Sequence, residues 1–329
     1  MNPIRKWFIN SRPTALPQSL LPALLAFFLA MQSENFVWWL GLIGVVGVVF
    51  AHLGLNLFDD YFDFKKKKSD YREELVHEGF RARIGKTPYL VSGESTLKQL
   101  LVACCIFCGI AVALGAIVFV FRGEMILYIA AVAAFLGIFY SAPPLRLSYH
   151  GLGELVIGVM FGPLVMLGVY YAACSEFNEM ILLISLAAGL LVTNVVYIHS
   201  MLDVIPDEKI GKMTLAVVLR KKKYQLVALA CIEFIPFIII ILGVVFRFFS
   251  PWFLLTFVTF PMAVSLFYMM VEFTRNPDRK FAPRFWMGPL NKWERICEAG
   301  IDWFMIRWLT ARNLMTFFCL VCIIVSFLM

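Results

Sequence analysis

Long apolar runs separated by short polar connections dominate this chain. The apolar windows fall at about 15–32, 36–58, 99–121, 124–143, 151–173, 179–202, 224–246, 252–272 and 313–329. Most of them are long enough to cross a bilayer as a helix. The pattern therefore predicts an all-α polytopic membrane protein, a bundle of nine transmembrane helices.

Positive charge alternates between the two sets of connections. Of the 29 Lys and Arg residues, 27 lie before the first window or in every second connection after it. The two exceptions are Arg122 and Arg247. Because positively charged loops stay in the cytoplasm, the chain is expected in the plasma (inner) membrane with its N-terminus cytoplasmic and its C-terminus outside.

Composition agrees with a membrane protein and narrows its partners. Hydrophobic residues make up 61% of the 329 residues, and charged residues only 16%. No polar linker divides the chain, so residues 1–329 are expected to form a single domain. The net charge of +7 follows from the cytoplasmic loops, which indicates a lipid bilayer and no nucleic acid as partner. The eight cysteines lie mostly in apolar windows and predict neither zinc nor disulfides. Nothing in the pattern sets an oligomeric state.

An acidic cluster closes the second window. It consists of Asn56, Asp59, Asp60 and Asp63. On a helix Asn56, Asp60 and Asp63 share one face, which suits a hard divalent cation that needs converging oxygen ligands. The alternative is a helix end that frays into a solvated, charged loop.

A second acidic pair closes the sixth window. Asp203 and Asp207 are four residues apart, although Pro206 is expected to break or kink the helix there. Both clusters belong to the same cytoplasmic face, which predicts a central cavity open to that side.

Such a cavity suits a ligand that is both phosphorylated and hydrophobic. Mg²⁺ binds through a few carboxylates plus phosphate oxygens, so the carboxylates predict a Mg²⁺-bound diphosphate. Lys212 and Arg146 are candidate cations for it, and Lys67 and Lys68 are weaker ones. A polyprenyl diphosphate fits this description.

The segment 273–312 differs from the other connections. It holds four tryptophans among charged residues: Trp286, Trp293, Trp303 and Trp308. Amphipathic stretches rich in Trp are typical of the membrane interface. An interfacial segment is therefore expected, with a substrate lid as the alternative.

These motifs resemble the UbiA superfamily of intramembrane prenyltransferases, and within it the 1,4-dihydroxy-2-naphthoate prenyltransferase branch. The first family motif is matched by Asp60, Asp63 and Asp70, with Asp59 where the family usually has Asn. The second is matched in full by Asp203, Asp207, Gly211, Lys212, Thr214 and Leu215. Segments around Tyr140 to Arg146, Gly151 to Glu154 and Arg12 to Pro17 match as well.

The resemblance implies a transferase that moves a polyprenyl group from polyprenyl diphosphate to a small aromatic acceptor by electrophilic substitution. For a dihydroxynaphthoate in menaquinone biosynthesis, the ring carboxylate would leave as CO₂. It assigns Asp60, Asp63, Asp70, Asp203 and Asp207 to Mg²⁺. Asn56 and Lys212 would contact the diphosphate or a metal ligand, and the ring of Tyr140 would face the allylic cation. Arg146 and His199 are candidates for acceptor recognition, with a structural hydrogen bond as the alternative for His199.

One departure bears on the acceptor. Where that branch often carries Asn-Asn-x-Arg, this chain has His199, Ser200, Met201 and Leu202. A different acceptor, such as 4-hydroxybenzoate, therefore stays open, and so does the prenyl chain length. Among other classes, an ion-coupled transporter would need carboxylates near mid-span, whereas these lie at helix ends. A CDP-alcohol phosphotransferase would need an Asp-Gly-x-x-Ala-Arg motif, which is absent.

Overall fold

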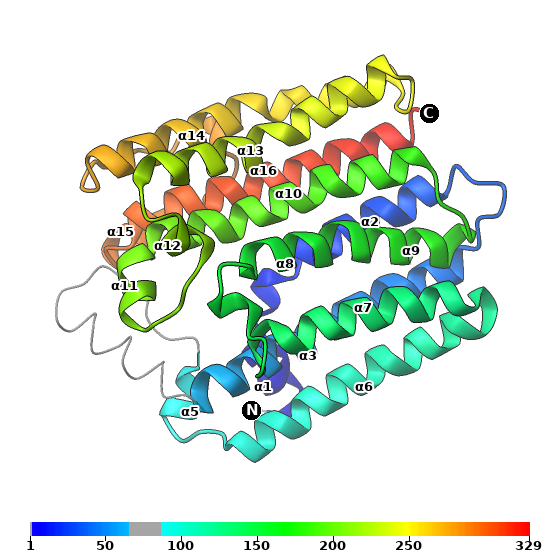
Figure 1. Cartoon of the computed structure of the whole chain (residues 1–329), viewed down its shortest axis with the longest axis horizontal. Coiled ribbons are helices and arrows are strands. Elements are labelled where there is room, and N and C mark those ends of the chain that lie inside the picture. The colour runs from blue at the N-terminus through cyan, green and yellow to red at the C-terminus, as the bar shows by residue number, and fades with distance from the viewer. Residues whose placement is uncertain (1, 66–86) are drawn as a thin grey trace.

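The computed structural model describes residues 2–65 and 87–329, and in these ranges the chain is a bundle of helices with no strand (Figure 1). Eight segments are long and apolar enough to cross a membrane. They are α3 (Trp38–Lys65), α6 (Leu97–Arg122), α7 (Glu124–Ser141), α8 to α9 (Gly153–Cys174), α10 (Glu179–Leu202), α13 (Lys222–Val245), η4 with α14 (Pro251–Arg275) and α16 (Asp302–Ser326). The expected all-α membrane bundle is confirmed.

The first apolar window forms a shorter helix than the nine-span prediction required. Helix α2 (Pro17–Ala30) has 14 residues, or about 21 Å, against a hydrocarbon core of about 30 Å. The segment around it nevertheless runs the length of the bundle. Arg12 contacts Asp60 near the end of α3, and Gln32 Nε2 donates to the Ser326 carbonyl, 2.6 Å away at the end of α16. Among the described residues, eight helices rather than nine have spanning length.

Glycines allow α8 and α10 to approach closely. A Cβ on Gly162 would lie 2.4 Å from the Gly189 Cα, and one on Gly158 would lie 1.9 Å from the Thr193 hydroxyl. Between α8 (Gly153–Val159) and α9 (Val165–Cys174) the helix widens into the π-turn η3 (Met160–Leu164). Pro163 lies in this turn and lacks an amide hydrogen to donate. The same turn forms part of the wall of a cavity of about 560 Å³.

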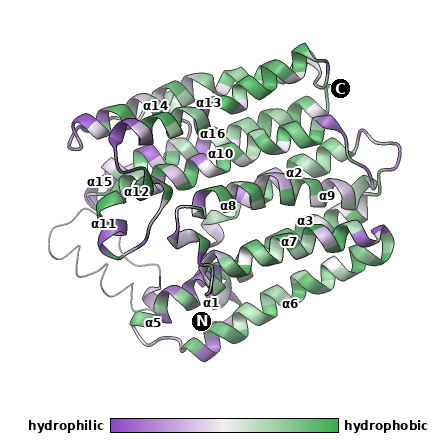
Figure 2. Ribbon diagram, viewed as in Figure 1, coloured by the Kyte–Doolittle hydropathy of each residue, from purple (hydrophilic) through white to green (hydrophobic). Residues whose placement is uncertain are grey.

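The short helices gather at one end of the bundle (Figure 1). They are α5 (Pro88–Val91), α11 (Val204–Lys209), α12 (Leu215–Leu219) and α15 (Trp293–Glu298). The N-terminal helix α1 (Pro3–Asn10) and the turns η1 (Pro13–Ala15), η2 (Leu147–Tyr149) and η5 (Phe285–Met287) complete the fold. Figure 2 shows apolar residues along the helix bodies and hydrophilic residues mainly at their ends.

The last helix begins earlier than predicted. It starts at Asp302, not near residue 313, so Trp303 and Trp308 belong to α16 and lie outside any separate interfacial segment. Its buried Arg307 explains the difference. The Arg307 guanidinium donates to the Met269 carbonyl at 3.2 Å and lies over the Phe273 ring at 5.1 Å. A buried charge with partners inside the bundle lowers the mean hydropathy of the segment, but it does not end the membrane helix.

Candidate active site

A cavity of about 560 Å³ lies between the elements that carry the two aspartate clusters. Its wall is built from α1, η1, α2, α3, α5, α7, α8, η3, α10 and α16, together with the segment after Asp203. Five of the residues predicted from the sequence line it: Asn56, Tyr140, His199, Asp207 and Lys212. Residues about 150 positions apart therefore line one cavity.

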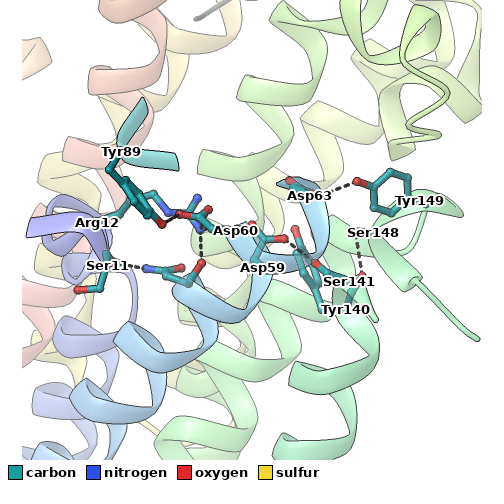
Figure 3. A network of polar contacts seen from close by, with 11 residues as sticks. Ser11, Arg12, Asp59, Asp60, Asp63, Tyr89, Tyr140, Ser141, Ser148 and Tyr149 are labelled. Atoms are coloured by element: carbon teal, nitrogen blue, oxygen red, sulfur yellow. Dashed lines mark hydrogen bonds and ion pairs between the residues drawn. The ribbon is translucent and has the colours of Figure 1, made fainter. Parts of the chain in front are cut away.

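The first cluster lies at the C-terminal end of α3. Asn56 and Asp59 face the cavity, whereas Asp60 is fully buried beside it. The Asn56 side chain donates to the Ser11 carbonyl at 2.9 Å, which ties α3 to the N-terminal segment. Ser141 on α7 donates to Asp59 (Figure 3). Asp59, which is not among the predicted ligands, is thus part of the cavity wall.

Arg12 joins these groups together. Its Nη2 lies 3.1 Å from Asp60 Oδ1 and 3.3 Å from Asp59 Oδ2, and it donates to the Asn56 carbonyl at 3.0 Å (Figure 3). Burial lowers the pKa of Arg12, but the charges of Asp60 and Asp59 raise it by more, so the net shift is upward. Arg12 therefore stays a cation and holds two carboxylates close together.

Two tyrosines donate hydrogen bonds to the first cluster. Tyr89, on α5, donates to Asp60 Oδ2 at 3.0 Å, and Tyr149 donates to Asp63 Oδ1 at 2.6 Å (Figure 3). Burial raises the pKa of Tyr89, and the charge of Asp60 raises it further, so this phenol remains a donor. The predicted ligand Asp70 and the weaker candidates Lys67 and Lys68 lie outside the described residues.

The second cluster begins where α10 ends. Asp203 is fully buried, and its Oδ2 lies 3.2 Å from His199 Nε2 one turn earlier. Asp207 follows on α11 and lines the cavity. The His199 ring packs edge-on against Phe304, with centroids 5.1 Å apart. His199 thus contacts Asp203 and Phe304 and also borders the cavity.

A tight turn presents Lys212 to the same cavity. Gly211 has φ +67°, a left-handed conformation that Gly adopts without strain. The Lys212 amide can then donate to the Asp207 carbonyl at 2.8 Å. Beyond the turn, the buried Glu154 carboxylate accepts from the Leu215 amide at 3.1 and 3.2 Å. Glu154 therefore anchors the start of α12.

Arg146 lies at the start of the turn that carries Tyr149. It adopts φ +44° just before η2 and is not among the cavity-lining residues. Its carbonyl accepts from the Tyr149 amide at 2.8 Å, so it positions the tyrosine that binds Asp63. Tyr140 does reach the cavity, and its carbonyl accepts from Ser148 Oγ at 2.7 Å.

The donor set fits Mg²⁺ held jointly with a phosphorylated ligand. In residues 2–65 and 87–329 no three carboxylate, His or Cys side chains converge as a complete protein metal site. Mg²⁺ commonly uses one or two carboxylates plus phosphate oxygens and water. Asp59 and Asp60 already share one cation, Arg12, and Asp207 lines the same cavity from the second cluster.

Sequence reasoning missed three site residues. Arg12 belongs to the quoted Arg-Pro entry segment, but nothing in its spacing points to Asp60. Asp59 is absent from the predicted ligands because it replaces Asn in the family motif. His52 lines the cavity from the middle of α3 and is 4% exposed. A single His in an apolar window gives no signal of its own.

Comparisons with known proteins agree with this geometry. Residues 19–290 match the model described as the UbiA prenyltransferase family. The 1,4-dihydroxy-2-naphthoate octaprenyltransferase of Bacillus subtilis is 29% identical over 256 residues, which cover 78% of each chain. The 2-carboxy-1,4-naphthoquinone phytyltransferase of a Synechocystis species is 26% identical over 281 residues, 83% of this chain and 85% of that one.

A solved structure shares the fold. It is a UbiA homologue from Archaeoglobus fulgidus bound to GPP and Mg²⁺, with a TM-score of 0.61 and 16% identity over 97% of this chain and 99% of that one.

Proposed function

The chain belongs to the UbiA prenyltransferase family, and we propose that it transfers a polyprenyl group from polyprenyl diphosphate to 1,4-dihydroxy-2-naphthoate with loss of CO₂. The observation that carries this proposal is the single cavity lined by Asn56 and Asp59 from the first cluster and by Asp207 and Lys212 from the second. The names of the Bacillus and Synechocystis relatives support a naphthoate acceptor. Because those names carry different prenyl groups, they leave the chain length open.

The carboxylates are the proposed metal holders. Asp60, Asp63, Asp70, Asp203 and Asp207 would hold Mg²⁺, the ion that the Archaeoglobus homologue binds together with GPP. When bound, Mg²⁺ would neutralise the diphosphate and stabilise the charge that it gains on leaving. The cavity-wall position of Asp59 makes it a further candidate ligand.

The protein cations and aromatic rings act on the two ends of the breaking bond. Lys212 and Arg12 place positive charge beside the diphosphate as the allylic C–O bond breaks. The ring of Tyr140 lines the same cavity and can stabilise the allylic cation through its face. Apolar neighbours such as Ile157 exclude water, which would otherwise capture that cation.

The acceptor ring then completes the exchange. Its electron pair forms the new C–C bond to the prenyl group, and the bond from the ring to its carboxylate breaks to release CO₂. The electron pair of that bond restores aromaticity, so the products are the prenylated naphthoquinol, diphosphate and CO₂. No external oxidant or reductant is needed.

A direct assay tests the proposal. Purified protein in nanodiscs receives labelled prenyl diphosphate with dihydroxynaphthoate or 4-hydroxybenzoate, with Mg²⁺ or with EDTA. We expect Mg²⁺-dependent prenylation of dihydroxynaphthoate with equimolar CO₂, and a loss of at least about a hundredfold in Asp207→Asn. If only 4-hydroxybenzoate is prenylated, the acceptor is 4-hydroxybenzoate and not dihydroxynaphthoate. Wild-type rates in Asp207→Asn would contradict the proposed site.

A further inference from the structure

His52 is a polar side chain deep in the apolar part of the cavity. It lies eight residues before Asp60 on α3, or about 12 Å farther from the diphosphate end of the helix. It is 4% exposed, lines the cavity, and stacks on Phe161 with centroids 4.6 Å apart and planes inclined by 29°. Burying an imidazole inside a membrane bundle costs free energy unless its ring nitrogens form hydrogen bonds.

One of its ring nitrogens is already committed. Nδ1 lies 2.5 Å from the Ser19 hydroxyl on α2, and that hydroxyl also lies 3.3 Å from the Leu16 carbonyl. When the hydroxyl donates to the carbonyl, the proton between Ser19 and His52 belongs to Nδ1. In this tautomer Nε2 keeps a lone pair for a donor in the cavity.

The chemistry of the two substrates decides which donor fits. A prenyl tail offers no hydrogen-bond donor. An ionised diphosphate only accepts hydrogen bonds, and the cations Arg12 and Lys212 line the cavity to bind it. The hydroxyl of an aromatic acceptor is a donor, and the Phe161 ring beside His52 offers a surface for an aromatic ring.

We propose that His52 Nε2 accepts a hydrogen bond from a ring hydroxyl of the aromatic acceptor and so determines which acceptors react. The inference rests on the proposed function. An accepted hydrogen bond also raises electron density in the ring, which strengthens its attack on the allylic cation. Ser19 acts as a positioning residue that holds the imidazole in the required tautomer.

Methyl ethers of the acceptor provide the test. Wild type, His52→Leu and His52→Gln receive dihydroxynaphthoate or either of its monomethyl ethers, with prenyl diphosphate held at saturation. Wild type should prefer the free diol over one ether by at least about tenfold in kcat/KM, because that ether cannot donate. His52→Leu should lose most of this preference and raise the acceptor KM about tenfold, and His52→Gln should retain part of it.

Two measurements separate this effect from general damage. The KM for prenyl diphosphate and the Mn²⁺ affinity measured by electron paramagnetic resonance should stay within twofold of wild type. Thr256→Val removes a buried hydroxyl on η4, away from the cavity, and should leave the acceptor preference unchanged. An unchanged preference and acceptor KM in folded His52→Leu would overturn the inference.

Three further outcomes also test the role of His52. If His52→Leu does not fold, Ser19→Ala keeps the imidazole but frees Nδ1, and a preference shifted by less than threefold would count against the inference. If only 4-hydroxybenzoate reacts, the same comparison uses 4-methoxybenzoate. If wild type prenylates neither acceptor, the proposed function fails. Equilibrium binding of labelled dihydroxynaphthoate then decides on His52, since equal Kd values in wild type and His52→Leu refute its role.

Discussion

At the scale of single residues, the Arg12 guanidinium lies between the carboxylates of Asp59 and Asp60. Its replacement by Gln leaves two adjacent carboxylates without that charge. We expect Arg12→Gln to destabilise the metal-free protein by about 1–3 kcal/mol and to lower activity at least about tenfold. Mg²⁺ should restore part of the stability because it supplies the missing positive charge. Thermal unfolding with Mg²⁺ or EDTA, together with turnover, measures both effects.

Arg275 offers the matched control for Arg12. It is exposed and lies 3.9 Å from Glu272, a geometry that stabilises little in water. Arg275→Gln should change unfolding by less than about 0.5 kcal/mol with or without Mg²⁺. Equal destabilisation of the two variants, or no response of Arg12→Gln to Mg²⁺, would contradict the role given to Arg12.

The hydrogen bond from Tyr89 to Asp60 can be tested on its own. Its hydroxyl is one donor to Asp60, and the ring packs edge-on against Trp7 at 6.0 Å. Tyr89→Phe keeps the ring and removes only the donor. We expect a cost of about 1 kcal/mol in stability and a several-fold change in Mn²⁺ affinity measured by electron paramagnetic resonance. A Trp7→Phe control should leave Mn²⁺ affinity unchanged, and an unaltered affinity in Tyr89→Phe would show that the hydrogen bond does not position Asp60.

The sequence singles out the aspartates as candidates but gives no sign of their partners. Asp60, Asp63, Asp203 and Asp207 follow the ends of apolar windows, and a carboxylate at the end of a membrane helix is costly enough to indicate function. Arg12 is 48 residues from Asp60, and the two meet only through the packing of α2 on α3. Spacing within one helix carries no information about such contacts.

At the scale of elements, Glu154 joins α8 to the loop that carries Lys212. Its carboxylate caps the Leu215 amide, and the Gly151 amide donates to the Met213 carbonyl at 2.6 Å beside it. Glu154→Ala should therefore loosen the loop and lower activity about tenfold or more without changing the cavity residues. Glu154→Gln keeps one acceptor oxygen and should lose less.

Limited proteolysis can follow this loop directly. Trypsin should cut within 209–223 faster in Glu154→Ala than in wild type, because the anchored backbone is protected. Glu179→Ala, an exposed change at the start of α10, should leave the cleavage rate unchanged. Equal cleavage of both variants would mean that the carboxylate does not hold the loop.

Hydropathy predicted the elements except where charge is satisfied inside them. Asp302, Arg307 and Arg312 lower the apolar character of the first three turns of α16 and placed its predicted start near residue 313. Arg307 is fully buried, and its guanidinium contacts the Met269 carbonyl and the Phe273 and Phe281 rings. These partners come from other elements, so a window that scores residues one by one cannot include them.

At the scale of the whole molecule, α2 decides how the termini lie relative to the membrane. Fourteen residues alone do not cross the hydrocarbon. Arg12 nevertheless contacts α3 at one end of the bundle and Gln32 contacts α16 at the other. The segment 12–32 is thus expected to cross together with its flanking turns, and the charge distribution predicts that the N-terminus is cytoplasmic and the C-terminus outside.

Cysteine labelling tests this orientation in the full chain. Cys297 on α15 is exposed and lies in a connection predicted to be cytoplasmic, whereas Glu34 is exposed in the first connection, predicted to be outside. In intact cells a membrane-impermeant maleimide should label Glu34→Cys and spare Cys297. In inside-out vesicles Cys297 should react and Glu34→Cys should not. Ile4→Cys, exposed on α1, reports on 12–32, and labelling of Ile4→Cys from the same side as Glu34→Cys would mean that 12–32 does not cross. The reverse pattern for Glu34→Cys and Cys297 would place the active site outside the cytoplasm.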